Sequence, residues 1–479
     1  MPFEFNNSKP HSSSPDSEHL VAVDYQTKPC SNSPLYRNIV DKFFHVGYDI
    51  PTAEQRRQMK GRSDCLVGSN EEARKKANES IEGVTKDPYN YTYSKEEYKQ
   101  HKESLKSSFG GLGLGIDLTV VDSDGRPVHP TNVEEAKRME ADDSLPRSVV
   151  VSEVRKDTPA AKAGFQTDDV ISNINGVDEL HRNEDAVVSD IRGPLGTSIR
   201  VTVLRNGEPV ELKATRAEIK TTSVDDPEYR GKDNDIAYIK IKNFHVDAST
   251  QFEAAMRKMP DAKAYVLDFR DDGGGEVDEA LKLPQNLVER GSLMFKTKRE
   301  ESSPDKPIYS STQYRLTADR FFTVEGRVSN PTMQPANLTT TGSERKSYLA
   351  NGKPIVMITN GGTASAAELA IAAVHDNSLS ETVGEPSHGK GIIQCNWPVT
   401  GGWTMKTTCG RYLTPTKHWM GDSERHRYPL QPDKRVKTPD LIAYGVKPYG
   451  SSADDQLNVA IAEAERLKLG GAPIRSNAN

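Results

Sequence analysis

The feature that most restricts the fold is a strand, a glycine-rich turn and a helical run, which occur in that order twice. "AYVLDF" at 264–269 and "PIVMIT" at 354–359 are short apolar runs rich in β-branched residues, and each leads through glycines into a helical pattern. A third run, "DIAYIKI" at 235–241, has a similar composition. Short apolar runs of this kind are typical of strands buried on both faces. The repeat therefore predicts an α/β layer over this part of the chain.

The rest of the chain divides by composition. The first residues are rich in Ser, Pro and Asn, which predicts disorder. A helical pattern follows, in which Ser94 and Glu97 are spaced as a capping box. A β-rich part comes next, where Asn206-Gly207 between two apolar runs predicts a hairpin. The predicted parts are a disordered tail (1–34), a helical region (35–108), a β-rich domain (109–220), an α/β core (221–450) with a polar insertion (299–350), and a C-terminal helix and tail (451–479).

Charge and hydropathy exclude two classes of protein. The formal net charge of −6 argues against a nucleic-acid binder, which normally presents a basic face. No apolar stretch approaches the roughly 18 residues of a membrane span. The N-terminus lacks the apolar core of a signal peptide, so we expect a soluble chain with no visible secretory signal.

The cysteines at 30, 65, 395 and 409 show no C-x-x-C spacing, which argues against a metal site. Cys395 and Cys409 could face each other across a hairpin that turns near Gly401. Two free thiols in a reducing compartment are an equally good interpretation.

One stretch, "VGEPSHGKGIIQ", contains two partial motifs. Gly384 to Lys390 spells G-x-x-x-x-G-K, but Gly391 stands where a P-loop needs Ser or Thr, and a strand-like run follows where a helix is needed. Ser387 to Lys390 spells S-x-x-K, but the companion motifs of the penicillin-binding enzymes are missing. Neither a nucleotide site nor a Ser387 nucleophile is favoured.

Ser365 has a more favourable position for chemistry. It follows a predicted strand and a double glycine, and the run Ala366 to Val374 consists of strong helix formers. A serine at a helix N-terminus lies beside unpaired N–H groups, which would stabilise an oxyanion. An ordinary N-cap serine occupies the same position, so Ser365 alone does not decide between the two.

The spacing around Ser365 resembles that of the C-terminal processing, or tail-specific, serine proteases. Ser365 precedes Glu368 by three residues, Lys390 follows 25 residues later, and Gln394 lies four beyond it. The resemblance implies that Ser365 is the nucleophile, Lys390 the base and Gln394 the residue that positions the base. A free lysine has a pKa of about 10.4, so burial must lower it before it can accept a proton at neutral pH.

The turn "LDFRDDGGGEVDEA" resembles the D-L-R-x-N-x-G-G motif of the same family. The resemblance implies that Gly274 or Gly275 donates one backbone N–H to the oxyanion and that Ala366 donates the other. Asp272 stands where the family has Asn. We expect Asp268 and Arg270 to form a structural ion pair.

The β-rich region resembles a PDZ domain in "GLGLGI", "DTPAAKAGFQTDDVISNING" and "IRGPLGTSIRVTVLRNG". Such domains accept a peptide as an added strand and bind its C-terminal carboxylate through a glycine loop. The resemblance implies that Gly113, Leu114, Gly115 and Ile116 form this loop. Val187 and Ile191 would line the groove, although packing in the domain core is an alternative for both.

The sequence thus predicts a multidomain α/β protein with a helical N-terminal region, a β-rich PDZ domain and, by resemblance, a crotonase-like protease core. We expect a serine endopeptidase that uses Ser365 and Lys390, needs no cofactor or metal, and acts on proteins or peptides with free C-terminal tails. The alternative is a PDZ adaptor on an inactive protease scaffold. Most of the resembled family works outside the cytoplasm, but the sequence leaves compartment and oligomeric state open.

Overall fold

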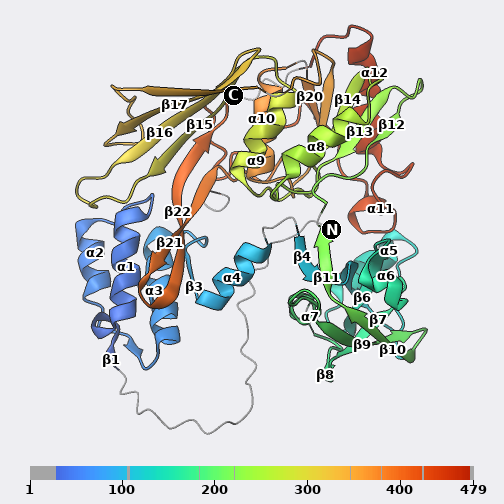
Figure 1. Ribbon diagram of the computed structural model, residues 1–479, viewed down its shortest axis with the longest axis horizontal. Helices are drawn as coiled ribbons and strands as arrows, with labels where there is room; N and C mark the ends of the chain where they lie inside the picture. The colour runs from blue at the N-terminus through green and yellow to red at the C-terminus, as the bar shows by residue number, and fades with distance from the viewer. Residues whose placement is uncertain are drawn as a thin grey trace. The chain divides into compact units, whose positions relative to one another are not determined.

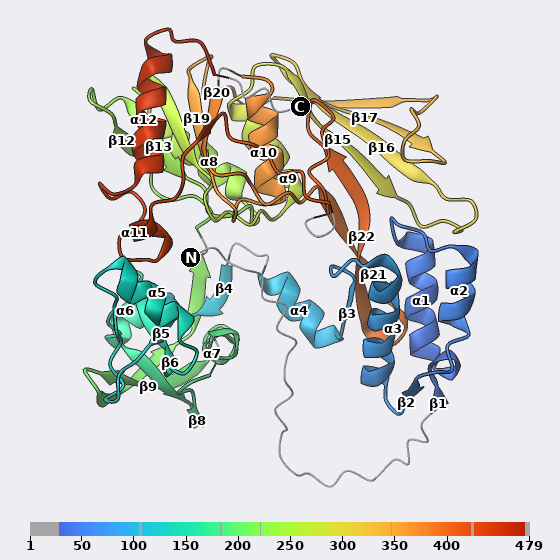
Figure 2. The same cartoon turned by 180° about the vertical axis from the view of Figure 1, so that it is seen from behind.

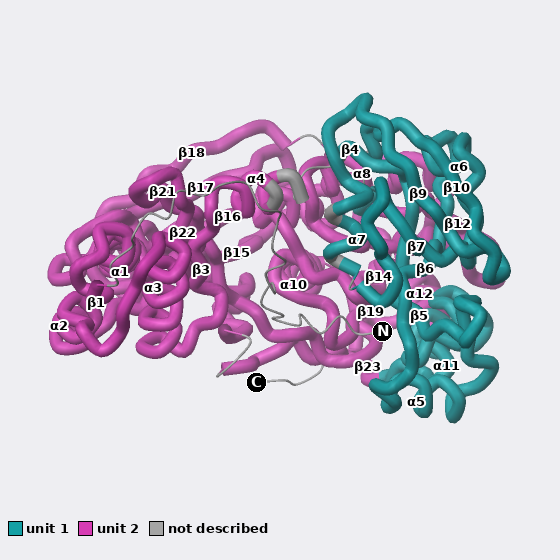
Figure 3. Tube along the Cα trace, turned by 90° about the horizontal axis from the view of Figure 1, so that it is seen from below, with its two compact units in different colours: residues 1, 103–223, 436–459 teal, residues 2–102, 224–435, 460–479 magenta. Residues whose placement is uncertain are grey.

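The computed structural model describes residues 28–104, 108–182, 184–220, 222–345, 347–378, 380–422 and 426–474 (Figure 1). Their contacts define two compact units (Figure 3). The first comprises the described residues of 103–223 and 436–459, and the second comprises those of 2–102, 224–435 and 460–479. Most of the predicted tail, residues 1–27, lies outside the described residues.

A six-stranded sheet in the order β12-β13-β14-β19-β20-β23 forms the centre of the second unit. Only β12 is antiparallel to its neighbour. Helices α8, α9 and α10 pack beside the sheet (Figure 1). The bounds are β12 (Glu228–Arg230), β13 (Ile236–Lys240), β14 (Ala264–Asp268), β19 (Ile355–Thr359), β20 (Ser380–Gly384), β23 (Lys434–Arg435), α8 (Ala248–Arg257), α9 (Val277–Lys282), η2 (Leu283–Asn286) and α10 (Ala366–His375).

Burial explains why these runs form this layer. Every residue of β14 and β19 is buried, as expected for strands covered on both faces. The alanine-rich helix α10 is buried from Ala366 to Val374. Small side chains let such a helix approach its neighbours closely, and the helix begins where Ser365 ends the preceding turn. The α/β layer predicted from the sequence is therefore confirmed.

A second, antiparallel sheet has the order β18-β17-β16-β15-β22-β21, and β3 also pairs with β22. The segment 299–350, predicted as a polar insertion of little periodicity, supplies three of these strands. Its outer strand β18 is exposed at every residue, which explains why no alternation marks it. The bounds are β15 (Gly291–Arg299), β16 (Tyr309–Leu316), β17 (Arg320–Val328), β18 (Thr339–Glu344), β21 (Ile392–Val399), η3 (Thr400–Gly402), β22 (Trp403–Leu413) and β3 (Tyr91–Tyr93).

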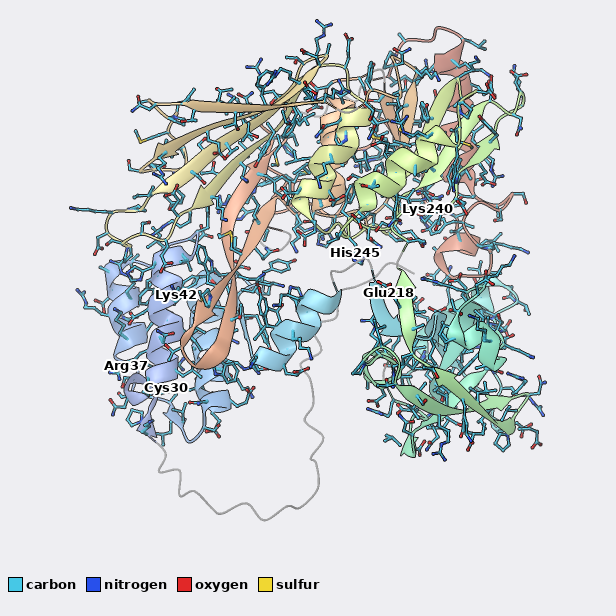
Figure 4. All side chains as sticks on the ribbon, viewed as in Figure 1. Cys30, Arg37, Lys42, Glu218, Lys240 and His245 are labelled. Carbon is cyan, nitrogen blue, oxygen red and sulfur yellow. A yellow bond between two sulfur atoms is a disulfide. The ribbon has the colours of Figure 1, made fainter. Side chains whose placement is uncertain are left out.

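The N-terminal helices lie beside the β21–β22 hairpin (Figure 2). They pack around their own hydrophobic core, which includes Val399 and Met405 of that hairpin. Lys42, labelled in Figure 4, forms an ion pair with Glu301 of the insertion. The Ser94–Glu97 capping box is confirmed, since each backbone N–H donates to the other side chain. The bounds are β1 (Lys28–Pro29), η1 (Cys30–Asn32), α1 (Pro34–Val46), α2 (Ala53–Lys60), β2 (Leu66–Val67), α3 (Asn70–Thr85) and α4 (Lys95–Ser104).

The predicted tail extends too far. Residues 28–34 belong to β1, η1 and the first turn of α1, because Cys30 is buried and forms a disulfide with Cys65 (Cα–Cα 5.6 Å). This pair was not predicted. The second disulfide joins Cys395 to Cys409 across β21 and β22 (Cα–Cα 5.7 Å), which decides between the two alternatives that the sequence left open.

The first unit contains a six-stranded sheet in the order β10-β9-β7-β6-β5, with β8 paired to β7. The predicted hairpin at Asn206-Gly207 joins β9 and β10, and both turn residues have positive φ (55° and 86°). The bounds are β4 (Ser108–Gly111), β5 (Leu114–Val120), α5 (Val133–Ala141), β6 (Arg147–Val154), α6 (Pro159–Ala163), β7 (Val170–Ile174), β8 (Val177–Asp178), α7 (Glu184–Ile191), β9 (Ser198–Arg205), β10 (Glu208–Thr215), β11 (Ala217–Lys220) and α11 (Asp440–Ala443).

The last helix, α12 (Asp455–Lys468), contributes residues to both units. Among the helices that the structure describes, none is long and apolar enough to cross a membrane.

Candidate active site

The predicted site residues converge at one edge of the parallel sheet. The glycine turn 273–275 follows β14, Ser365 follows β19, and Lys390 follows β20, and these three strands are neighbours in the sheet. The carboxyl ends of neighbouring parallel strands meet at the same edge, which is where open α/β sheets usually bind ligands. The topology therefore brings three distant segments together.

Ser365 has a backbone conformation that differs from that of an ordinary capping serine. Its φ is 56° and its ψ is −117°, whereas an N-cap residue is usually extended. A positive φ is uncommon outside glycine, and such strained residues cluster at functional sites. The side chain is partly exposed, at the N-terminus of α10. Ser365 is thus presented on a sharp strand-to-helix turn.

The buried carboxylate of Glu368 connects the serine segment with the lysine segment. Its Oε2 accepts hydrogen bonds from the backbone N–H groups of Ser365 (2.8 Å) and Lys390 (2.9 Å). Its Oε1 accepts from the Gly389 N–H (2.7 Å) and the Ser387 hydroxyl (2.5 Å). Burial raises the pKa of Glu368, and these donors oppose that rise. Glu368 therefore fixes the spacing between the predicted nucleophile and the predicted base.

The sequence did not predict which residues surround the Lys390 side chain. Its Nζ lies 3.9 Å from the centre of the Tyr89 ring. Burial, followed by the positive charge of Lys406, lowers the pKa of Lys390 to about 8, while Asp87 and Glu368 oppose this shift. A lysine with such a pKa is partly neutral at physiological pH and can accept a proton.

Among the described residues, Lys390 Nζ forms no hydrogen bond with Ser365 or with Gln394. The Gln394 Nε2 is buried and has no acceptor in that part of the chain. The ladder shifts register between Ile393 and Gln394, where β22 contributes one extra residue, Cys409, opposite β21. Tyr412 also lies here: its hydroxyl donates to the Lys390 carbonyl and interacts with the Ser365 side chain.

The glycine turn approaches the start of α10 closely. A Cβ on Gly274 would lie 2.7 Å from the Ala364 oxygen and 2.8 Å from the Ala366 nitrogen, so only glycine fits there. The Gly274 N–H donates to Asp272 Oδ1 (2.8 Å) and is not free for an oxyanion. Within the described residues, no acceptor is present for the N–H groups of Gly275 and Ala366. Of the two predicted glycines, Gly275 is therefore the better donor.

Several other predictions concern the surroundings of the site. Asp268 and Arg270 form a fully buried ion pair (2.6 Å), as predicted. Ser387 is buried, donates to Glu368 and accepts from the Leu430 N–H (2.9 Å), which suits a structural residue. The segment after Lys390 continues into β21, so a phosphate-binding helix does not follow it.

Among the described residues, one cluster of carboxylates has a spacing that could hold a metal ion. It consists of Asp233, Asp235 and Glu465. Lys468 forms ion pairs with all three, at 3.2, 2.9 and 2.7 Å, and so supplies the positive charge itself.

In the first unit, β5 is an edge strand of the sheet and begins at the predicted carboxylate loop. Gly113 has φ 84°, and Leu114 and Ile116 are only partly buried. Val187 and Ile191 are 0 % and 7 % exposed and belong to the hydrophobic core of the domain. Their contribution to a peptide groove stays a prediction.

Two regions of the chain match models of known protein families. Residues 235–436 match the family model for peptidase family S41, and residues 113–215 match the PDZ domain. A "Probable CtpA-like serine protease" of Staphylococcus haemolyticus (strain JCSC1435) is 25 % identical over 378 residues, which cover 78 % of this chain and 62 % of the relative. Its namesake in Staphylococcus aureus (strain N315) is 26 % identical over 399 residues, 82 % of this chain and 66 % of the relative.

The photosystem II D1 C-terminal processing protease is similar in structure (TM-score 0.46, 18 % identity, covering 88 % of this chain and 97 % of the other). The chain spans slightly less than two thirds of the length of the two staphylococcal relatives. The match to peptidase family S41 at residues 235–436 and the match to the PDZ domain at residues 113–215 occur in the combination that the sequence motifs predicted. The predicted class, a serine-type peptidase, is the class to which these relatives are assigned.

Proposed function

We propose that this protein is a serine endopeptidase in which Ser365 is the nucleophile and Lys390 the general base. The observation that carries the proposal is the strained Ser365, whose backbone is tied through Glu368 to a lysine of lowered pKa. Neutral lysine can activate a serine hydroxyl in the same way as the histidine of the Ser-His-Asp triad.

In the proposed reaction, Lys390 Nζ removes the proton from Ser365 Oγ as the oxygen attacks the scissile carbonyl. The backbone N–H groups of Gly275 and Ala366 then bind the oxyanion of the tetrahedral intermediate. The Lys390 ammonium returns its proton to the leaving amine, and an acyl-enzyme forms at Ser365. Water, deprotonated by Lys390, hydrolyses this ester and regenerates the serine.

Proton transfer requires the Lys390 amine to move from the Tyr89 ring to within hydrogen-bond distance of Ser365. Catalytic hydrogen bonds are often long or absent before substrate binds, so this geometry is compatible with the proposal. The buried Gln394 Nε2, which lacks an acceptor among the described residues, is a suitable donor to the neutral amine once it has moved.

The PDZ domain supports a further part of the proposal, which is selection of substrates by their C-terminal tails. Among the described strands, β5 pairs on one side only, with β6, and it follows directly from Gly113. A peptide could add there as a further strand, with its carboxylate on the N–H groups of the loop 113–116.

The test compares cleavage of an unfolded protein with an apolar, free C-terminal tail by wild type, Ser365→Ala and Lys390→Ala, followed by mass spectrometry. Ser452→Ala and Lys437→Ala, both at exposed positions, are the matched controls. We expect both site variants to lose at least about 10³-fold in activity and both controls to retain it. Cleavage by Ser365→Ala at the wild-type rate would disprove the assignment. Tail binding without cleavage by wild type would favour the adaptor.

A further inference from the structure

Asp272 connects the two segments that supply the proposed oxyanion donors. Its Oδ1 accepts the hydrogen bond from Gly274 N–H (2.8 Å), which fixes the peptide between Gly273 and Gly274, one peptide before the Gly275 N–H. Its main-chain carbonyl accepts from the Ala364 N–H (2.8 Å), two residues before Ala366. One residue thus holds both the glycine turn and the start of the nucleophile turn.

The other carboxyl oxygen of Asp272 lacks a partner. Asp272 is 0 % exposed, and its Oδ2 is buried with no hydrogen-bond donor among the described residues. An ionised carboxylate leaves water at a cost of several kcal/mol unless its oxygens are paired or hydrogen-bonded. A neutral carboxylic acid in the same place avoids most of that cost.

The two nearest cations among the described residues, Arg270 and Lys240, both contact Asp268. Arg270 is occupied by Asp268, and the Lys240 ammonium (labelled in Figure 4) donates to the Arg270 carbonyl (3.0 Å) and lies 3.7 Å from Asp268. Burial raises the pKa of Asp272 well above its ordinary value, against the smaller opposing effects of the Gly274 N–H and Lys240.

The charge of Asp272 also matters for the reaction. Its carboxyl binds the residue next to Gly275, so an ionised Asp272 would place a negative charge beside the developing oxyanion. In a dry site such a charge opposes the transition state strongly, because few water molecules screen it. The reaction therefore favours a neutral group at this position.

We propose that Asp272 is a positioning residue for the oxyanion-binding turn and that it performs this role as the neutral carboxylic acid. The inference rests on the proposed function, in which Gly275 and Ala366 bind the oxyanion. It predicts that Asn, which is neutral and has an acceptor oxygen in place of Oδ1, replaces Asp272 in function, whereas Ala does not.

The protonation state is tested by infrared spectroscopy of the full chain at neutral pH. The spectra of wild type, Asp272→Asn and Asp278→Asn are compared, because Asp278 is an exposed carboxylate in the following helix. We expect the C=O stretch of a protonated carboxylic acid in wild type and in Asp278→Asn, with a loss of intensity in Asp272→Asn. Equal intensity in all three proteins would show that Asp272 is ionised and would overturn the proposal.

The positioning role is tested with the tail-bearing substrate. We expect Asp272→Asn to keep kcat within about threefold of wild type and Asp272→Ala to lose about 10²-fold in kcat, the usual effect of a lost oxyanion donor, with KM little changed. Equal activity of the two variants would overturn this role. If Asp272→Ala does not fold, the infrared spectrum of Asp272→Asn still tests whether Asp272 is protonated. If wild type and Ser365→Ala cleave alike, the proposed function fails, whereas the infrared result for Asp272 stands.

Discussion

The chemistry of single residues depends here on the charge of Lys390. Burial and the neighbouring Lys406 disfavour its ammonium, whereas Asp87 and Glu368 favour it. Since only the neutral amine accepts a proton from Ser365, kcat/KM should rise with pH around the lowered pKa of about 8 and level off above it. With the unperturbed pKa of a free lysine, the same rise in kcat/KM would occur at about pH 10.

Lys406→Met should move this rise to higher pH. Removing a like charge stabilises the Lys390 ammonium, so the pKa of Lys390 increases, by about half a unit to one unit, and activity at pH 7.5 falls. The measurement is kcat/KM from pH 6 to 10, with the exposed Lys263→Met as the control. An unchanged profile would show that Lys406 does not act on the base.

At the scale of secondary-structure elements, the segment before β3 completes the surroundings of the base. Asn90 binds β22 through the Thr407 hydroxyl and the Thr408 N–H (3.2 Å), and β3 pairs with β22. This attachment holds the Tyr89 ring against Lys390. The N-terminal helical region thus contributes directly to the site, although Tyr89 and Lys390 are far apart in the sequence.

Tyr89→Leu should shift the profile in the opposite direction to Lys406→Met. The ring face stabilises the ammonium by about 0.5–1 kcal/mol, so its removal should lower the pKa of Lys390 by roughly half a unit. Tyr89→Phe keeps the ring and should match wild type. The same pH series measures both variants, and an identical effect of Leu and Phe would contradict a role for the ring.

The elements also show what the sequence can and cannot predict. The runs at 264–269 and 354–359 are continuous apolar strands followed by glycine turns, so β14, β19 and the helix after Ser365 were predictable from local pattern. Strand β18 was not, because it is exposed on both faces and carries no alternation. The contacts of Tyr89 and Glu368 were missed because they arise from packing between distant segments, which leaves no local signal.

At the scale of the whole molecule, one chain contains a region that matches the PDZ domain and a region that matches peptidase family S41. In the proposed function, the first region selects the substrates that the second cleaves. Binding of a terminal carboxylate by backbone N–H groups is a set of charge-assisted hydrogen bonds, each worth about 1.5–3 kcal/mol. Replacing the free carboxylate by an amide should therefore weaken tail binding at least about tenfold. Fluorescence anisotropy with labelled peptides and the full-length Ser365→Ala protein measures both affinities.

A pair of glycine variants assigns this preference to the predicted loop. Gly113 and Gly196 both have positive φ (84° and 78°), so alanine strains the backbone at each. A Cβ on Gly113 would lie 2.5 Å from the Thr158 side chain, whereas one on Gly196 meets no atom within 4 Å. Gly113→Ala should therefore displace the loop and abolish the preference for a free carboxylate, while Gly196→Ala should keep it. Equal binding of acid and amide peptides by the parent protein would argue against tail selection, and residues 235–436 would then have to select substrates by other contacts.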